Sequence, residues 1–210
     1  MPIQPLIYEV EIRFFAESYD DACDKLPFLE ESLNEEESWK SDTYGLELFK
    51  SGQLLRIGQG PLIGITRRYL GWKSPDTGEF ANIRQEIGEE ITNGIENSII
   101  LDKLGGCNII ESYTDVINEL EKLGHYRFMS FNGVDKFGYH EPLELTVKVM
   151  TCPQIKYPLL IELEKTAFTE EEAKKREDEL FNLSVDLRLD NLLVKKEPPT
   201  LIYESIYGNQ

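Results

Sequence analysis

The sequence predicts an α+β protein built on an antiparallel, eight-stranded tunnel β-barrel with helices packed outside it. Two observations carry this prediction. About eight segments alternate apolar and polar residues, as strands do, and most of them follow one another through short turns. The polar positions of several segments hold ionic side chains rather than Ser, Thr or Asn. Eight strands can close into a barrel just wide enough for a small ligand, and with the charged faces turned inward that barrel becomes a polar tunnel.

The size and charge of the chain limit its partners and its compartment. It has 210 residues and a net charge of −17, which argues against nucleic acid or an anionic membrane as a general partner. No apolar run approaches the ~20 residues of a membrane span, and the N-terminus lacks the pattern of a signal peptide. Cys23, Cys107 and Cys152 indicate neither a disulfide framework nor a zinc site. We therefore expect a cytoplasmic protein.

The first half of the chain is predicted to be mostly strand. Residues 6–15 alternate as a strand, and Ser18 with Asp21 forms a capping box that opens an acidic helix to about Ser32. The segment 74–78, Ser-Pro-Asp-Thr-Gly, is a strong turn signal between the last two strands of this half. Four further strands are expected at residues 39–49, 53–57, 62–72 and 80–91.

The second half alternates helices and strands. A helix is expected at about 114–123, with Gly124 as the residue that ends it. Thr169 and Glu172 form a second capping box, which starts a charged amphipathic helix to about Leu183. Three strands are expected at residues 126–134, 143–150 and 159–166.

The C-terminal tail is predicted to be an extended break at residues 196–200, followed by a short edge strand at 201–203. No repeat or low-complexity linker divides the chain. A single domain over residues 1–210 is therefore the simplest organisation, with a core of about 6–183 and a C-terminal extension of 184–210.

Two of the predicted strands, near opposite ends of the chain, each carry two alternating carboxylates. Glu9 and Glu11 share a face with Arg13, and Glu162 shares a face with Glu164, because side chains two apart on a strand project to the same side. Two such pairs brought together make an oxygen-ligand site for a hard divalent cation. The alternative is an ordinary antiparallel sheet in which the charged face is simply exposed to solvent.

Five short motifs follow one another between residues 8 and 182. They are Glu9-x-Glu11-x-Arg13, the strand that contains Arg56, the segment 70–75 with Lys73, Arg84-x-Glu86 and Glu162-x-Glu164. In type, order and spacing these motifs resemble those of the CYTH proteins, also called triphosphate tunnel metalloenzymes. That family includes thiamine triphosphatases, inorganic triphosphatases and class IV adenylyl cyclases.

The resemblance implies a tunnel that takes a small-molecule triphosphate and hydrolyses it with the help of a metal. The carboxylates that it implies as ligands of Mg²⁺ or Mn²⁺ are Glu9, Glu11, Glu86, Glu162 and Glu164. The basic side chains that it implies as phosphate ligands are Arg13, Arg56, Lys73 and Arg84, the last three also as catalytic residues. Phosphoryl transfer depends mainly on positioning and electrostatics, so no nucleophilic side chain is needed.

The chain also departs from the family pattern. Gly58 stands where the family has the second arginine of Arg-x-Arg. The basic pair expected on the strand after the 114–123 helix is replaced by Ser130, Phe131 and Asn132, and Thr151 with Cys152 stands in place of Leu-Asp. The carboxylates that the resemblance implies as metal ligands are therefore all present, whereas several of the basic residues that it implies for phosphate binding are missing.

These departures leave three hypotheses for the function. The first is a metal-dependent phosphohydrolase that acts on an organic or inorganic triphosphate. The second is a non-catalytic CYTH-like protein that binds a nucleotide, a polyphosphate or a protein partner. The third is a class IV adenylyl cyclase, in which the substrate's own 3′-hydroxyl attacks.

A purely structural alternative concerns the interior of the barrel. Uncompensated buried charges are costly, so acids and bases could be there only to neutralise one another. The oligomeric state stays open, with a homodimer among the options.

Overall fold

A computed structural model describes residues 7–62 and 65–208, and it contains a closed antiparallel barrel of eight strands with helices outside it. This confirms the predicted fold class. In their order around the barrel the strands are β1 (Ile7–Ala16), β10 (Leu159–Ala167), β9 (Leu145–Thr151), β8 (Arg127–His140), β2 (Glu35–Tyr44), β3 (Leu54–Leu62), β4 (Ile65–Lys73) and β5 (Asn82–Glu90).

The described residues fall into two compact units that interleave along the chain. One unit, called unit A here, contains Trp39–Asp76 and Gln85–Phe131. The other, unit B, contains Ile7–Ser38, Thr77–Arg84 and the chain from Asn132 onward. The organisation as one domain with a core of 6–183 stays a prediction.

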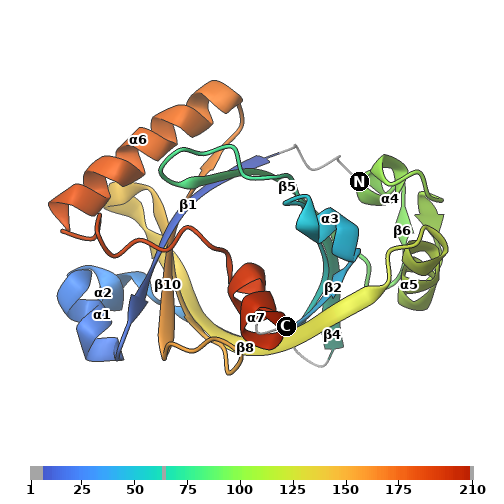
Figure 1. Ribbon diagram of the computed structural model, residues 1–210, viewed down its shortest axis with the longest axis horizontal. Coiled ribbons are helices and arrows are strands. Elements are labelled where there is room, and N and C mark those ends of the chain that lie inside the picture. The colour runs from blue at the N-terminus through green and yellow to red at the C-terminus, as the bar shows by residue number, and fades with distance from the viewer. Residues whose placement is uncertain (1–6, 63–64, 209–210) are drawn as a thin grey trace. The chain divides into compact units, whose positions relative to one another are not determined.

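Unit B buries one face of its strands beneath helices. Val10, Ile12 and Phe14 alternate along β1 and belong to a core with the apolar residues of β9 and β10. The helix α6 (Glu170–Asp186) packs against β1 and β10, and Figure 1 shows it lying across them. Because the apolar side chains of β1 take this face, its charged side chains project to the opposite face of the sheet.

Helix boundaries in unit B follow their capping residues. Ser18 accepts a hydrogen bond from the backbone N–H of Asp21 and starts α1 (Tyr19–Lys25), as predicted. The acidic helix does not run unbroken to Ser32, because Pro27 follows α1 and a proline disfavours helix at the residue before it. A separate short helix, α2 (Leu29–Ser32), follows.

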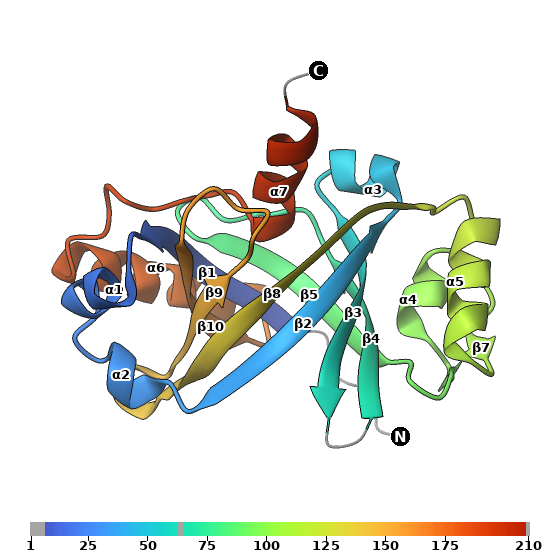
Figure 2. The same ribbon diagram turned by 90° about the horizontal axis from the view of Figure 1, so that it is seen from below.

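Unit A likewise buries one face of its strands, in a second hydrophobic core. The strands β2, β3 and β4 pair in register, and their apolar face packs with α4 (Ile99–Lys103) and α5 (Tyr113–Lys122). Figure 2 shows these two helices side by side in green and yellow-green. The short strands β6 (Ile95–Glu96) and β7 (Ile109–Ile110), which come directly before and after α4 in the chain, pair with each other. The sequence prediction missed α4 and both of these strands.

The predicted strand at 39–49 is wrong in its second half. The strand β2 ends at Tyr44, and Gly45 has a φ of +70°, which an extended strand does not allow. The helix α3 (Leu46–Lys50) follows. The strand β2 also begins earlier than predicted, at Glu35.

The predicted edge strand at 201–203 is also wrong. These residues belong to α7 (Pro198–Tyr207), which two prolines begin. Proline is tolerated in the first turn of a helix, where its missing N–H would have no intrahelical partner. A short 3₁₀ turn, η1 (Glu141–Leu143), precedes β9.

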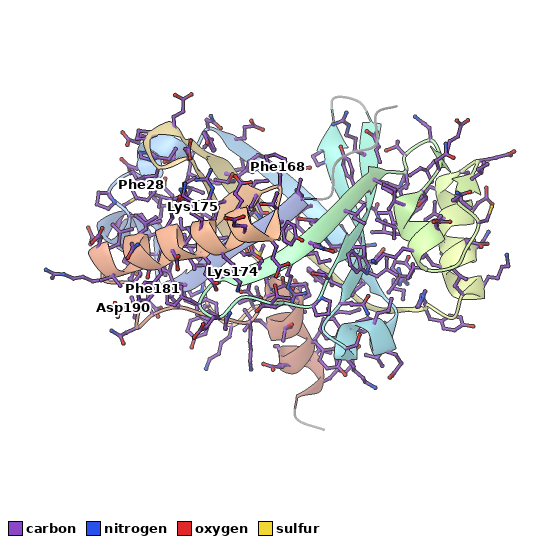
Figure 3. All side chains as sticks on the ribbon, turned by 90° about the horizontal axis from the view of Figure 1, so that it is seen from above. Phe28, Phe168, Lys174, Lys175, Phe181 and Asp190 are labelled. Carbon is purple, nitrogen blue, oxygen red and sulfur yellow. The ribbon has the colours of Figure 1, made fainter. Side chains whose placement is uncertain are left out.

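The outer face of α6 is polar, with apolar rings beside it. Lys174 and Lys175 extend from the helix, while Phe168 precedes it and is largely exposed (Figure 3). Within the described ranges, no helix combines the length and the hydropathy needed to pass through a lipid bilayer.

Candidate functional site

Three charged residues of unit B lie directly opposite one another on neighbouring strands. Arg13 of β1 faces Glu162 of β10, and Glu162 faces Lys148 of β9. The Nε atom of Arg13 donates to Oε1 of Glu162 at 2.7 Å, and Nζ of Lys148 donates to Oε2 at 2.8 Å. Both oxygens of Glu162 therefore have a cationic donor. We call Arg13, Glu162 and Lys148 the alternating row.

The alternating row holds its charges strongly. Burial opposes ionisation of Glu162, but the charges of Lys148 and Arg13 and their hydrogen bonds outweigh it, so the pKa of Glu162 lies below its usual range. Burial likewise opposes the charged form of Lys148, yet Glu162 and Glu164 raise the pKa of its amine above the usual value. The row is therefore fully ionised at neutral pH.

A second group of carboxylates, called the acidic cluster here, lies beside this row. Glu11 of β1 is directly opposite Glu164 of β10, and Glu9 lies two residues further along β1. Glu9, Glu11 and Glu164 each offer one oxygen, and the three oxygens lie within 4.8 Å of one another. Carboxylates that face each other across a sheet repel, and burial of Glu9 and Glu11 increases the cost. Oxygen ligands in this number and spacing suit a hard divalent cation.

Arg13 links the two groups. Its Nη2 atom donates to Glu11, and Nη1 donates to Oδ1 of Asn82 at 2.7 Å. The side chain is only 1% exposed, so these contacts are largely shielded from water. Arg13 therefore positions one carboxylate of the acidic cluster and one of the alternating row. Together, the row and the cluster contain four carboxylates and two cations.

Arg84 of β5 has an unexpected partner. Its Nε atom lies 2.9 Å from Oε1 of Glu197, the residue that precedes α7. The same oxygen lies 3.8 Å from Nη2 of Arg13. Glu197 therefore places a carboxylate from the C-terminal segment between two arginines that the sequence assigns to phosphate.

Unit A carries a separate group of charges on the face opposite its core, called the basic cluster here. Lys73 of β4 faces Glu86 of β5, with Nζ 3.7 Å from Oε2, and Nη2 of Arg56 lies 3.5 Å from Oε1 of the same carboxylate. Gly71 faces Arg56 across the sheet, and a Cβ there would lie 3.4 Å from Cγ of Arg56. The bare backbone at Gly71 thus lets Arg56 lie along β4. Two cations therefore contact one carboxylate in this cluster.

Each predicted site residue is accounted for within one unit or the other. Unit B contains Glu9, Glu11, Arg13, Arg84, Glu162 and Glu164, and unit A contains Arg56, Lys73 and Glu86. Glu162 is bound by Arg13 and Lys148 rather than grouped with the other carboxylates, and Glu86 lies between two cations. Their roles as metal, phosphate or catalytic residues stay predictions.

Three residues of this site, Lys148, Asn82 and Glu197, were not among the site residues of the sequence prediction. Asn82 could have been found, because it lies two residues before Arg84 and so projects from the same face of β5. Glu197 carries no such signal. It stands before two prolines in a tail segment, and no local pattern indicates that its side chain points inward.

Comparison with known proteins supports the fold. No protein-family model and no curated protein matches the chain. Solved structures, in contrast, do match this chain. The PH1819 protein of Pyrococcus horikoshii OT3 matches with a TM-score of 0.68 and 19% identity, over 93% of this chain and 98% of that one. A Vibrio parahaemolyticus protein described as a candidate adenylate cyclase matches with a TM-score of 0.65 and 12% identity, over 95% and 99% of the two chains.

A third match carries a described activity. The HpAC1 protein of Hippeastrum, whose description reports a dominant triphosphatase activity, matches with a TM-score of 0.53 and 14% identity, over 91% of each chain. At these identities the likeness establishes the fold alone. It agrees with the fold that the sequence motifs implied.

Proposed function

We propose, on the premise that this chain has the fold of the CYTH proteins, that it binds a small-molecule triphosphate with a divalent cation and hydrolyses it. The observation that carries this proposal is the acidic cluster. Glu9, Glu11 and Glu164 bring three carboxylate oxygens within 4.8 Å of one another on a largely buried face. Neighbouring carboxylates are costly without a cation.

The chemistry of the donors fits Mg²⁺ or Mn²⁺. Both are hard cations that prefer carboxylate oxygens and water and that commonly bridge to substrate phosphates. Glu9, Glu11 and Glu164 would hold the cation. Glu162 would support them indirectly, because it shares Arg13 with Glu11. A role for Glu86 as a further ligand rests on the motif resemblance.

The basic residues would hold the phosphate chain. In unit A, Arg56 and Lys73 lie 3.5 and 3.7 Å from the carboxylate of Glu86, and in unit B Arg84 would offer a guanidinium, a group that binds phosphate through paired N–H donors. A bound cation supplies neutralisation of phosphate oxygens and activation of a water molecule. The side chains contribute positioning and stabilisation of the charge that develops in the transition state.

A specific observation favours a second candidate, a non-catalytic binding protein. Arg13 directs its guanidinium nitrogens to Asn82, Glu11 and Glu162, and Arg84 contacts Glu197. Two of the basic residues implied as phosphate ligands are thus engaged by protein groups. A protein that binds an anion without turnover would tolerate this arrangement.

Turnover separates these candidates. Phosphate release from tripolyphosphate, ATP and thiamine triphosphate is measured with Mg²⁺ or Mn²⁺ for the wild type, Glu11→Gln and Glu164→Gln. Glu47→Gln serves as the control, because Glu47 is exposed on α3 and forms its ion pair with nearby Lys50. We expect turnover that both cluster variants abolish and that the control retains.

Other outcomes have distinct meanings. Turnover indifferent to both cluster variants would remove the metal assignment. Tight triphosphate binding without turnover would support the binding protein. Release of pyrophosphate from ATP would identify a class IV adenylyl cyclase instead.

A further inference from the structure

The C-terminal segment of unit B is tied to β1 and to the residue before β5 ahead of Glu197. The backbone N–H of Val194 donates to the carbonyl of Arg13 at 2.7 Å, and Leu193 forms a bridge with Phe14. Nζ of Lys195 then donates to the carbonyl of Ala81 at 2.7 Å. These contacts fix where the segment runs. They place the residues that follow Lys195 near the charged face of β1.

Glu197 uses its carboxylate in an unusual way for its position. It is the N-cap residue of α7, where a side chain ordinarily accepts a hydrogen bond from the first turn of the helix. Its side chain makes no such bond. The residue is only 5% exposed, and its carboxylate contacts Arg84 and Arg13 instead. The carboxylate of Glu197 is therefore not used as a hydrogen-bonding cap of the helix.

The contacts of Glu197 are ion pairs without good hydrogen-bond alignment. Its Oε1 atom is buried and has no aligned donor among the described residues, although Nε of Arg84 lies 2.9 Å away. Glu162, by contrast, accepts an aligned hydrogen bond of 2.7 Å from Arg13. Glu197 is thus held mainly by charge, and of the two carboxylates it is the one that a competing anion displaces more easily.

There is also space beside these groups. A cavity of about 160 Å³ is lined by Glu11, Arg13 and Asn82 on one side and by Leu193, Val194 and Lys195 on the other. This volume holds several water molecules. The stretch of chain that leads to Glu197 therefore borders a cavity beside Arg13.

Carboxylates and phosphates are bound by guanidinium groups in the same geometry. We propose that Glu197 is a specificity-determining residue that competes with substrate phosphate for Arg84 and Arg13. A chain of phosphates carries enough charge to displace it, whereas orthophosphate does not. Glu197 thereby lowers the affinity for small anions and favours polyphosphates. This inference rests on the proposed function of the site.

Calorimetry with two probes tests the proposal. Imidotriphosphate, a non-hydrolysable triphosphate, and orthophosphate are titrated in Mg²⁺ into the wild type, Glu197→Gln and Glu204→Gln. Glu204 is the matched control, because it is a half-exposed carboxylate on α7 that pairs with Lys196. We expect Glu197→Gln to bind imidotriphosphate about tenfold more tightly and to gain measurable orthophosphate binding. Glu204→Gln should behave as the wild type.

A double-mutant cycle with Arg84→Gln distinguishes competition from a structural role. If Glu197 competes through Arg84, the gain from Glu197→Gln is reduced in the Arg84→Gln background. Should Glu197→Gln fail to fold, Glu197→Asp replaces it, and the shorter side chain is expected to give a smaller gain in the same direction.

The remaining outcomes overturn the proposal in distinguishable ways. Equal or weaker imidotriphosphate binding by a folded Glu197→Gln, with binding by the wild type intact, overturns the competition and leaves the proposed function standing. No binding by any variant overturns both. If Glu197→Gln binds imidotriphosphate and the wild type does not, Glu197 competes strongly enough to prevent binding by the wild type.

Discussion

Nε of Arg13 donates a 2.7 Å hydrogen bond to Oε1 of Glu162, a residue near the other end of the chain, and both side chains are almost completely buried. The second oxygen of Glu162 accepts from Lys148. This arrangement separates two kinds of carboxylate on one face. Glu162 accepts hydrogen bonds from two protein cations, whereas Glu9, Glu11 and Glu164 bring three carboxylate oxygens within 4.8 Å of one another.

Removal of Arg13 should destabilise the protein strongly. In Arg13→Gln, Glu162 loses one of its two cationic partners, and Glu11 loses its hydrogen bond from the guanidinium. Loss of one partner of a buried ion pair costs about 3–5 kcal/mol of unfolding free energy. Urea denaturation measures this change. Arg67→Gln is the control, because Arg67 and Glu90 form an exposed pair at 3.7 Å, for which the expected loss is about 1 kcal/mol or less. Equal losses in the two variants would argue against a buried network.

Glu162→Gln and Glu164→Gln should change stability to very different extents when EDTA is present. Glu162→Gln removes the charge that pairs with Arg13 and Lys148, so the unfolding free energy falls. Glu164→Gln removes a repulsion from Glu11 together with an attraction to Lys148, so the unfolding free energy is expected to change by about 1 kcal/mol at most. Thermal unfolding followed by circular dichroism compares them. A similar loss in both variants would show that Glu164 is as well compensated as Glu162.

An arginine at position 58 should strengthen phosphate binding. Gly58 lies two residues from Arg56 on β3 and so projects from the same face, and a Cβ there would meet no atom within 4 Å among the described residues. Gly58→Arg is expected to tighten triphosphate binding about tenfold with little change in stability. Gly58→Gln, which adds a side chain without charge, is the control. Tightening by both variants would point to packing rather than charge.

Acid should weaken the attachment of α6 to β10 through Glu179. Burial opposes ionisation of Glu179, but hydrogen bonds from Arg176 and Lys165 outweigh it and hold the pKa of this carboxyl below its usual value of 4.5. A lowered folded-state pKa means that the stabilisation is complete above pH 4.5 and is lost as the pH falls through the folded-state pKa.

Glu179→Gln checks this dependence. The variant should lose about 1 kcal/mol at pH 7, and its difference from the wild type should shrink below pH 4.5. Urea denaturation at several pH values gives both numbers. A difference that stays constant into the acid range would mean that the charge of Glu179 does not contribute.

The parts of the site that the sequence could predict are those set by local periodicity. Alternation along β1 and β10 places Glu9 with Glu11 and Glu162 with Glu164, whatever the tertiary structure, because the side chains of a strand repeat every two residues. The hydrophobic face of β1 likewise predicts which side carries the charges. Those inferences needed no knowledge of the neighbouring strands.

The division of the carboxylates could not be predicted, because it depends on register between strands. A shift of one position would move Glu162 away from Arg13 and Lys148, and nothing local in the sequence sets that register. Glu197 was missed for a related reason, since its position follows from contacts with residues far away in the sequence, namely the backbone bond of Val194 to Arg13 and the side-chain bond of Lys195 to Ala81. The error at Gly45 is different. A glycine inside an apolar run can continue a strand or end it, and here its positive φ ends it.

Electron paramagnetic resonance titration of Mn²⁺, without any phosphate compound, tests most directly whether the acidic cluster is a cation site. The wild type and Glu47→Gln should each bind Mn²⁺ saturably, and Glu164→Gln should bind it at least about tenfold more weakly, since one charged ligand is lost. Absence of saturable binding in the wild type, or equal affinity in Glu164→Gln, would contradict the account.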